Sequence, residues 1–110
     1  MTQTLPDSPP PLCLLTLLAP QASEDALLDL LAACPELQQG YILVPAQGLG
    51  AGTQLLSVME QVQGRARRVL VQAVVRQDDW PALLQKLRAQ LPSPEVAYWL
   101  TPLLAQGRLA

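Results

Sequence analysis

Two segments of the chain are apolar at almost every position. Residues 12–18 read LCLLTLL, with Thr16 as the polar exception, and residues 69–75 read VLVQAVV, with Gln72 as the exception. A strand with one face in solvent alternates apolar and polar residues, so a continuous apolar run indicates burial on both faces. These two segments are therefore predicted to be the central strands of a sheet.

Two stretches carry the apolar spacing of an amphipathic helix. The first has a stripe made of Leu27, Leu30, Leu31 and Cys34, with Ser23 as its N-cap and Pro35 as its stop. The second follows a cap at Asp78 or Asp79, ends before Pro92, and has a stripe made of Trp80, Leu83, Leu84, Leu87 and Leu91. Two helices on one side cover only one face of a sheet, so the pattern predicts that something outside the chain covers the other face.

Two shorter segments complete the predicted sheet. Residues 41–44 are apolar and are closed by Pro45, which suits the end of an edge strand, and residues 95–103 form the last strand. Residues 47–64 connect the second strand to the third at 65–76, and the second half of this loop is expected to form one or two helical turns. The order β-α-β-β-α-β with right-handed crossovers predicts an α+β, ferredoxin-like fold, with an antiparallel sheet of order 4-1-3-2 and both helices on one face.

The first eleven residues differ in composition from the rest. They contain four of the chain's eleven prolines and several polar residues, and they are expected to form a disordered tail. Residues 12–110 are long enough for a single domain with a core built mainly from Leu and Val, because the chain contains no Phe.

The charge argues against several classes of partner. The net charge is −2 and the isoelectric point is about 4.8, which disfavours nucleic acid and anionic membranes. The N-terminal apolar run is too short to cross a bilayer and lacks a basic segment before it, so no membrane insertion is expected and the cytoplasm is the expected location.

The chain contains no histidine, the commonest general base near neutral pH and a frequent metal ligand. We therefore expect no catalytic residues, no metal site and no cofactor. Cys13 and Cys34 are not spaced as a metal or redox pair and are predicted to be small core residues.

A block that spans the end of the loop resembles a known family. Residues 56–65 read LSVMEQVQGR and are followed by Arg67 and Arg68. This is similar to the L-S-x-x-E-Q-V-x-G-R block of an uncharacterised bacterial PII-like family of small ferredoxin-like proteins. The likeness continues in C-terminal residues: the pair Tyr98-Trp99, Pro102 and the G-R-L ending at 107–109.

The resemblance implies a homotrimer similar to PII signalling proteins and CutA-type proteins, in which three sheets face the threefold axis. It implies that the loop at 47–64 projects outward, and that the protein contacts a transporter or an enzyme through it. The chain lacks the long glycine- and arginine-rich C-terminal motif of true PII proteins, which argues against an ATP site of their kind. The family is also linked to heavy-metal efflux, but a chain without histidine supports a tight transition-metal site poorly.

Two sets of residues are candidates for binding a small anion. Backbone amides near glycines form anion nests, and the loop carries Gly48, Gly50 and Gly52, although a flexible loop tip is the simpler interpretation. Arg65 and Arg67 follow the loop on one face of the third strand, with Arg68 on the other, and Arg108 of a neighbouring subunit is a candidate third guanidinium. The alternative is that these arginines pair with Glu60 or Glu36.

The second half of the loop is the candidate partner-binding surface. Its apolar residues either contact another protein or pack on their own or a neighbouring subunit; they are Leu55, Leu56, Val58, Met59 and Val62.

Three function classes stay open at this point. The first is a PII-like regulatory protein that senses a small anion or nucleotide and signals through its loop. The second is an ACT-like amino-acid-binding regulatory domain, which shares this order of strands and helices. The third is a structural or scaffold subunit without a ligand, associated with heavy-metal efflux.

Overall fold

The computed structural model of the protein describes residues 11–50, 53 and 55–110. Gly52 therefore lies outside the described residues, and so does the predicted tail at 1–11 except for Pro11. The strands are β1 (Leu12–Pro20), β2 (Ile42–Gly48), β3 (Ala66–Arg76) and β4 (Ala97–Pro102), and the helices are α1 (Glu24–Ala32), α2 (Val58–Gln63) and α3 (Trp80–Gln90). Short 3-10 turns precede α1 and follow it, at Gln21–Ser23 and Pro35–Leu37.

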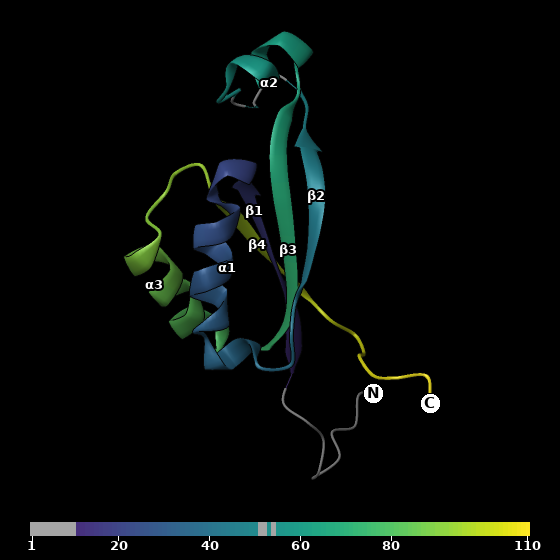
Figure 1. Cartoon of the computed structure of the whole chain (residues 1–110). Helices are drawn as coiled ribbons and strands as arrows, with labels where there is room; N and C mark the ends of the chain where they lie inside the picture. The colour runs from purple at the N-terminus through teal and green to yellow at the C-terminus, as the bar shows by residue number, and fades with distance from the viewer. Residues whose placement is uncertain (1–10, 51–52, 54) are drawn as a thin grey trace.

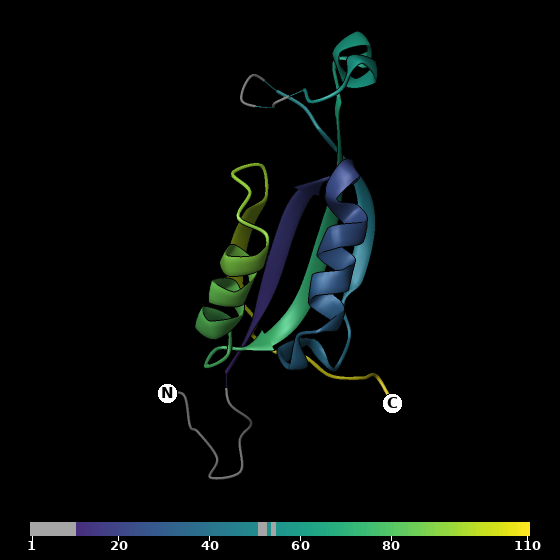
Figure 2. The same ribbon diagram turned by 60° about the vertical axis from the view of Figure 1, so that its left-hand side comes forward.

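The four strands form one antiparallel sheet in the order β2-β3-β1-β4. This confirms the predicted order 4-1-3-2 and places the two continuous apolar segments at the centre. The helices α1 and α3 lie side by side on the same face of the sheet, as predicted (Figures 1 and 2).

The helix-covered face holds the core. Alternate residues of β1 and β3, such as Leu15 and Val71, point into it and meet buried leucines of α1 and α3, such as Leu27 and Leu83. Cys13 and Cys34 are buried in the same cluster as free thiols, which confirms their predicted place in the core. Burial raises the pKa of both thiols, so the reactive thiolate is disfavoured.

The opposite face of the sheet is apolar and none of the described helices covers it; we call it the open face. It carries the other alternate residues of the strands, among them Leu14, Leu70 and Val74, and its edge residues Ile42 and Trp99 are 59% and 44% exposed. At its centre Gln72 donates a hydrogen bond of 3.4 Å from Nε2 to Thr16 Oγ1. The expected uncovered apolar face is therefore present in the single subunit.

One local prediction is wrong, and two predicted helix caps are confirmed in position but not in side-chain bonding. Pro45 does not close β2, which continues to Gly48; β2 is an edge strand bonded only to β3, so a residue without an N–H is tolerated on its outer side. Ser23 and Asp79 occupy the cap positions of α1 and α3, but neither side chain makes a capping hydrogen bond. At α1 the preceding 3-10 turn already accepts the Glu24 N–H through the Gln21 carbonyl.

Candidate functional site

The loop between β2 and β3 rises beyond the rest of the sheet. Ala66 at the start of β3 pairs with Gly48 of β2, whereas the pairing of β3 with β1 begins only at Arg68. The two strands therefore continue as a ribbon past the end of β1, and α2 stands at its tip, away from α1 and α3 (Figure 1). This confirms the predicted projection of the loop from the subunit.

Gly48 and Gly50 have conformational roles at the base of this loop. A Cβ on Gly48 would meet Thr53 Cγ2 at 2.9 Å and Ala66 Cβ at 3.2 Å, so only glycine fits there without a shift. Gly50 has a φ of 101°, a backbone conformation that other residues rarely adopt. Thr53 closes the turn by donating from Oγ1 to the Leu49 carbonyl at 2.8 Å. These contacts explain both glycines without a ligand.

The helix α2 begins with a capping box. Ser57 is the N-cap, and its Oγ accepts a hydrogen bond of 3.1 Å from the Glu60 N–H. In return, Glu60 Oε1 accepts a bond of 2.8 Å from the N–H of Leu56, one residue before the cap. Two N–H groups at the start of the helix are thereby satisfied by reciprocal bonds.

The second oxygen of Glu60 ties this helix to β3. Glu60 Oε2 accepts a hydrogen bond of 2.6 Å from the Arg67 N–H and lies 3.9 Å from Arg68 Nη1. The side chain is buried, and the backbone bonds from Leu56 and Arg67, with a further contribution from the Arg68 charge, lower the pKa of Glu60. We call Leu56, Ser57, Glu60, Arg67 and Arg68 the Glu60 network.

Because α2 is held in this way, its apolar side chains point away from the subunit. Val58 and Val62 are 76% and 79% exposed, and Met59 is 51% exposed. Leu56 is also exposed, whereas Leu55 is half-buried. The interpretation that this stripe packs on its own subunit is therefore wrong for Val58, Met59 and Val62. We call these three residues the α2 apolar face.

The arginines separate into two groups. Arg68 lies on the open face and is buried with Glu60, so the ion-pair interpretation holds for it. Arg65 donates from Nη1 to Gln47 Oε1 at 3.2 Å, and Arg67 is exposed opposite Gln47 in the strand register. Among the described residues no acidic side chain forms a salt bridge with Arg65 or Arg67.

Of the two other expectations about these charges, the pairing with Glu36 is wrong, and the contact with Arg108 of a neighbouring subunit stays a prediction. Glu36 pairs with Lys86 at 3.0 Å, so it is not a partner of the arginines. Arg108 belongs to the C-terminal segment, which leaves the sheet at the end opposite to the loop (Figure 1). A single subunit therefore brings together Arg65, Arg67 and the glycine turn, but not Arg108.

Glu60 is the residue whose role the sequence reasoning missed. The sequence predicts only an ion-pair role for Glu60, whereas its carboxylate accepts two backbone hydrogen bonds. The signal was present, because Ser57 and Glu60 have the S-x-x-E spacing of a capping box. The bond to the Arg67 N–H joins two elements and leaves no local signature.

Neither a metal centre nor a membrane span is found in the described part of the chain. No three His, Cys, Asp or Glu side chains lie close enough there to hold an ion. None of the described helices is long and apolar enough to cross a bilayer.

Residues 10–110 match the model of one protein family, described as "Protein of unknown function (DUF3240)". Among solved structures the chain is similar to a DUF3240 family protein from Shewanella baltica, with 21% identity and a TM-score of 0.71 over 90% of this chain and 97% of that one. No curated protein matches the chain in sequence.

The chain is also similar to CPII from Thiomonas intermedia, a nitrogen regulatory PII-like protein whose structure holds ADP, AMP and bicarbonate. The identity is 17% and the TM-score 0.64, over 90% of this chain and 97% of that one. A Bacillus cereus protein related to NIF3 gives 15% identity and a TM-score of 0.64, covering 94% of this chain but 28% of that chain. These likenesses show that the fold is PII-like.

We expect Glu60→Gln to loosen α2 while leaving the sheet intact. The amide oxygen can accept one of the two backbone hydrogen bonds, but the amide NH2 cannot accept the other, and the charge facing Arg68 is lost. Hydrogen exchange followed by mass spectrometry should show faster exchange, by about tenfold, in peptides covering residues 56–64. Glu95→Gln, at an exposed site, is the control and should match the wild type. Equal exchange in all three proteins would contradict a role of Glu60 in holding the helix.

The contribution of Glu60 to stability should also depend on pH. A carboxyl whose folded-state pKa is lowered stabilises the fold above its unfolded pKa, near 4.5, and loses this effect as the pH falls through the lowered value. The difference in Tm between wild type and Glu60→Gln should therefore be present at pH 7 and shrink as the pH falls below about 4. A difference that stays constant down to pH 2 would exclude this origin.

Proposed function

This chain belongs to the DUF3240 family, and from that membership and the geometry of its loop we propose that it is a PII-like regulatory protein that binds a small anion and signals through the loop. One observation carries the proposal. Arg65 and Arg67 are exposed, neither forms a salt bridge with an acidic side chain of the described residues, and the backbone N–H of Arg67 is part of the Glu60 network that holds α2. The protein transmits a signal and performs no catalysis.

The ligand we propose is a phosphate-bearing nucleotide or a small oxyanion such as bicarbonate. Guanidinium groups bind carboxylate and phosphate oxygens through a rigid fork of donors, and two of them flank Gln47 on one face of the ribbon. The ADP, AMP and bicarbonate bound by CPII support this class of ligand for a protein of the same fold. Arg108 of a neighbouring subunit is the proposed third contact.

The link between ligand and signal runs through Arg67. Its side chain belongs to the proposed anion site, and its backbone N–H donates to Glu60 Oε2, which also interacts with Arg68. An anion that draws the Arg65 and Arg67 side chains together displaces the start of β3 relative to α2. The orientation of the α2 apolar face then reports whether the site is occupied.

We propose that three copies of the chain cover each other's open faces. The open face is wide and apolar, and exposed patches of this kind mark interfaces in soluble proteins. The C-terminal segment adds exposed apolar side chains, since Leu104 and Leu109 are fully exposed. Assembly as a homotrimer buries these groups and leaves the loops pointing outward.

The α2 apolar face is the proposed contact for a transporter or an enzyme. Its exposed valines and methionine stand on a helix that the Glu60 network already orders, so docking costs little conformational entropy. We place the protein in the cytoplasm, where its two free cysteines would stay reduced.

The anion site is tested by calorimetric titration with ADP, AMP and bicarbonate. We expect binding by the wild type and a loss of at least tenfold in affinity for Arg65→Ala and Arg67→Ala, because each variant removes a charged hydrogen-bond donor. Arg76→Ala, an exposed arginine at the other end of β3, is the matched control and should bind as the wild type does. Undiminished binding by both loop variants would place the site elsewhere. Absence of any anion binding would favour the ligand-free scaffold.

The homotrimer is tested with Gln72→Glu, measured by size exclusion with light scattering. Gln72 is half-buried on the open face, so assembly would bring three new carboxylates into an apolar interface, at a cost of several kcal/mol for each unpaired ion. We expect a trimeric wild type and a dissociated Gln72→Glu variant. Gln85→Glu, on the exposed side of α3, should stay trimeric. A monomeric wild type would refute this assembly, and a side-by-side dimer would favour the ACT-like alternative.

The loop contact is tested by purifying the tagged protein from its host and identifying the bound proteins by mass spectrometry. Val58→Ser with Val62→Ser should lose a partner that the wild type retains, because the exposed apolar contact is replaced by hydroxyls. Ala82→Ser on the exposed side of α3 is the control. An identical set of bound proteins for all three chains would argue against docking through α2.

A further inference from the structure

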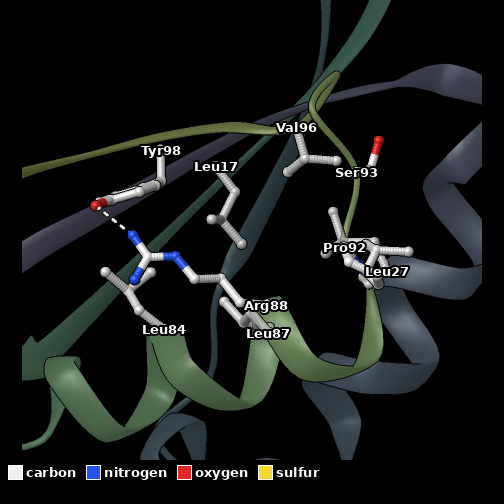
Figure 3. Close-up of a pocket in the computed structure, with 10 residues that line it drawn as sticks. Leu17, Leu27, Leu84, Leu87, Arg88, Pro92, Ser93, Val96 and Tyr98 are labelled. Atoms are coloured by element: carbon white, nitrogen blue, oxygen red, sulfur yellow. Dashed lines mark hydrogen bonds between the residues drawn. The ribbon is translucent and has the colours of Figure 1, made fainter.

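A cavity of about 310 Å³ lies between α3 and the sheet. Its walls come from both layers of the fold: Leu17 of β1, Leu27 of α1, Leu84 and Leu87 of α3, Val96 just before β4, and Tyr98 of β4. Figure 3 shows these side chains around a common space, with Tyr98 and Val96 opposite the leucines of α3. The pocket is therefore predominantly apolar.

One charged group stands at this cavity. Arg88 of α3 donates from Nη2 to the Tyr98 hydroxyl at 2.9 Å, and its guanidinium carbon lies 5.5 Å from the centre of the Tyr98 ring (Figure 3). These two contacts hold the guanidinium along the cavity. Among the described residues no acidic side chain forms a salt bridge with Arg88, although a guanidinium has five N–H donors to offer.

We propose that this cavity binds an amphipathic monocarboxylate, with its hydrocarbon part among the leucines and its carboxylate on Arg88. Leu17, Leu27 and Leu84 are buried and supply an apolar environment for a hydrocarbon chain. The Arg88 fork supplies the single anionic contact that a carboxylate needs, and the Tyr98 hydroxyl lies beside it.

The volume sets the size of the ligand. An apolar cavity of about 150 Å³ is known to accept benzene, which has six carbon atoms. A cavity of twice that volume accepts about ten to twelve non-hydrogen atoms, the size of a straight-chain acid of about eight carbons. A nucleotide is too large and too polar for these walls, so this site is separate from the proposed anion site at Arg65 and Arg67.

The test uses octanoate as the probe, with octan-1-ol and acetate as matched compounds, in calorimetric titrations of the full-length protein. Octanol keeps the hydrocarbon chain without the charge, and acetate keeps the charge without the chain. We expect octanoate to bind at least tenfold more tightly than either compound, and Arg88→Gln to bind octanoate at least tenfold more weakly than the wild type.

Two further variants test whether a change in octanoate binding comes from the cavity itself and not from misfolding or from the other site. Val96→Phe, at a half-buried position, fills part of the cavity and should also weaken binding. Arg65→Ala with Arg67→Ala leaves the cavity intact and should bind octanoate as the wild type does, whether or not nucleotides bind at the loop. Amide NMR shifts on titration should concentrate at Leu87, Val96 and Tyr98 and spare Gly48 and Ala66.

Three outcomes would overturn the proposal. The first is no octanoate binding at millimolar concentration. The second is equal binding by wild type, Arg88→Gln and Val96→Phe. The third is equal affinity for octanol and octanoate, which would remove the role assigned to the guanidinium.

Discussion

The strands β1 and β3 carry apolar side chains on both faces, and α1 and α3 cover only one of them. On the covered face, residues such as Leu15 and Val71 are buried against the helices, which supplies the main hydrophobic stabilisation of the subunit. On the open face, Leu14 and Leu70 are only partly buried. The proposed trimer depends on this unequal coverage.

The loop meets a different constraint, because a six-residue helix at the tip of a ribbon has too few internal hydrogen bonds to be stable alone. The Glu60 network supplies hydrogen bonds from outside the helix. One carboxylate accepts an N–H from each side, at Leu56 and Arg67, and its charge lies near Arg68. A polar cluster therefore allows the apolar residues of α2 to stay exposed on an ordered helix instead of collapsing onto the subunit.

The two proposed ligand sites use arginine in opposite environments. Arg65 and Arg67 lie on an exposed ribbon beside polar groups. An anion with several oxygens can bind there in place of water and keep most of its own hydration. Arg88 lies over a cavity walled by leucines, where a ligand gains most of its affinity by leaving water. The chemistry around each guanidinium, rather than the guanidinium itself, separates the two classes of ligand.

The strand order, the helix stripes and the exceptional positions Thr16 and Gln72 could be predicted from the sequence, because burial on one or two faces leaves a period in the residue pattern. The start of α2 was also encoded locally, in the spacing of Ser57 and Glu60, although that signal was overlooked. The exposure of Val58 and Val62 was not predictable, since an apolar stripe has the same spacing whether it packs or projects.

Contacts between residues distant in the chain were decided only by the tertiary structure. The continuation of β2 through Pro45 depends on its edge position, and the pairing of Glu36 with Lys86 depends on how two helical segments meet. The cavity beside Arg88 and Tyr98 exists because α3, α1 and β4 enclose a space that their leucines do not fill. The sequence determines which side chains are apolar and favour burial, whereas the volume left between helices and strands depends on how they pack.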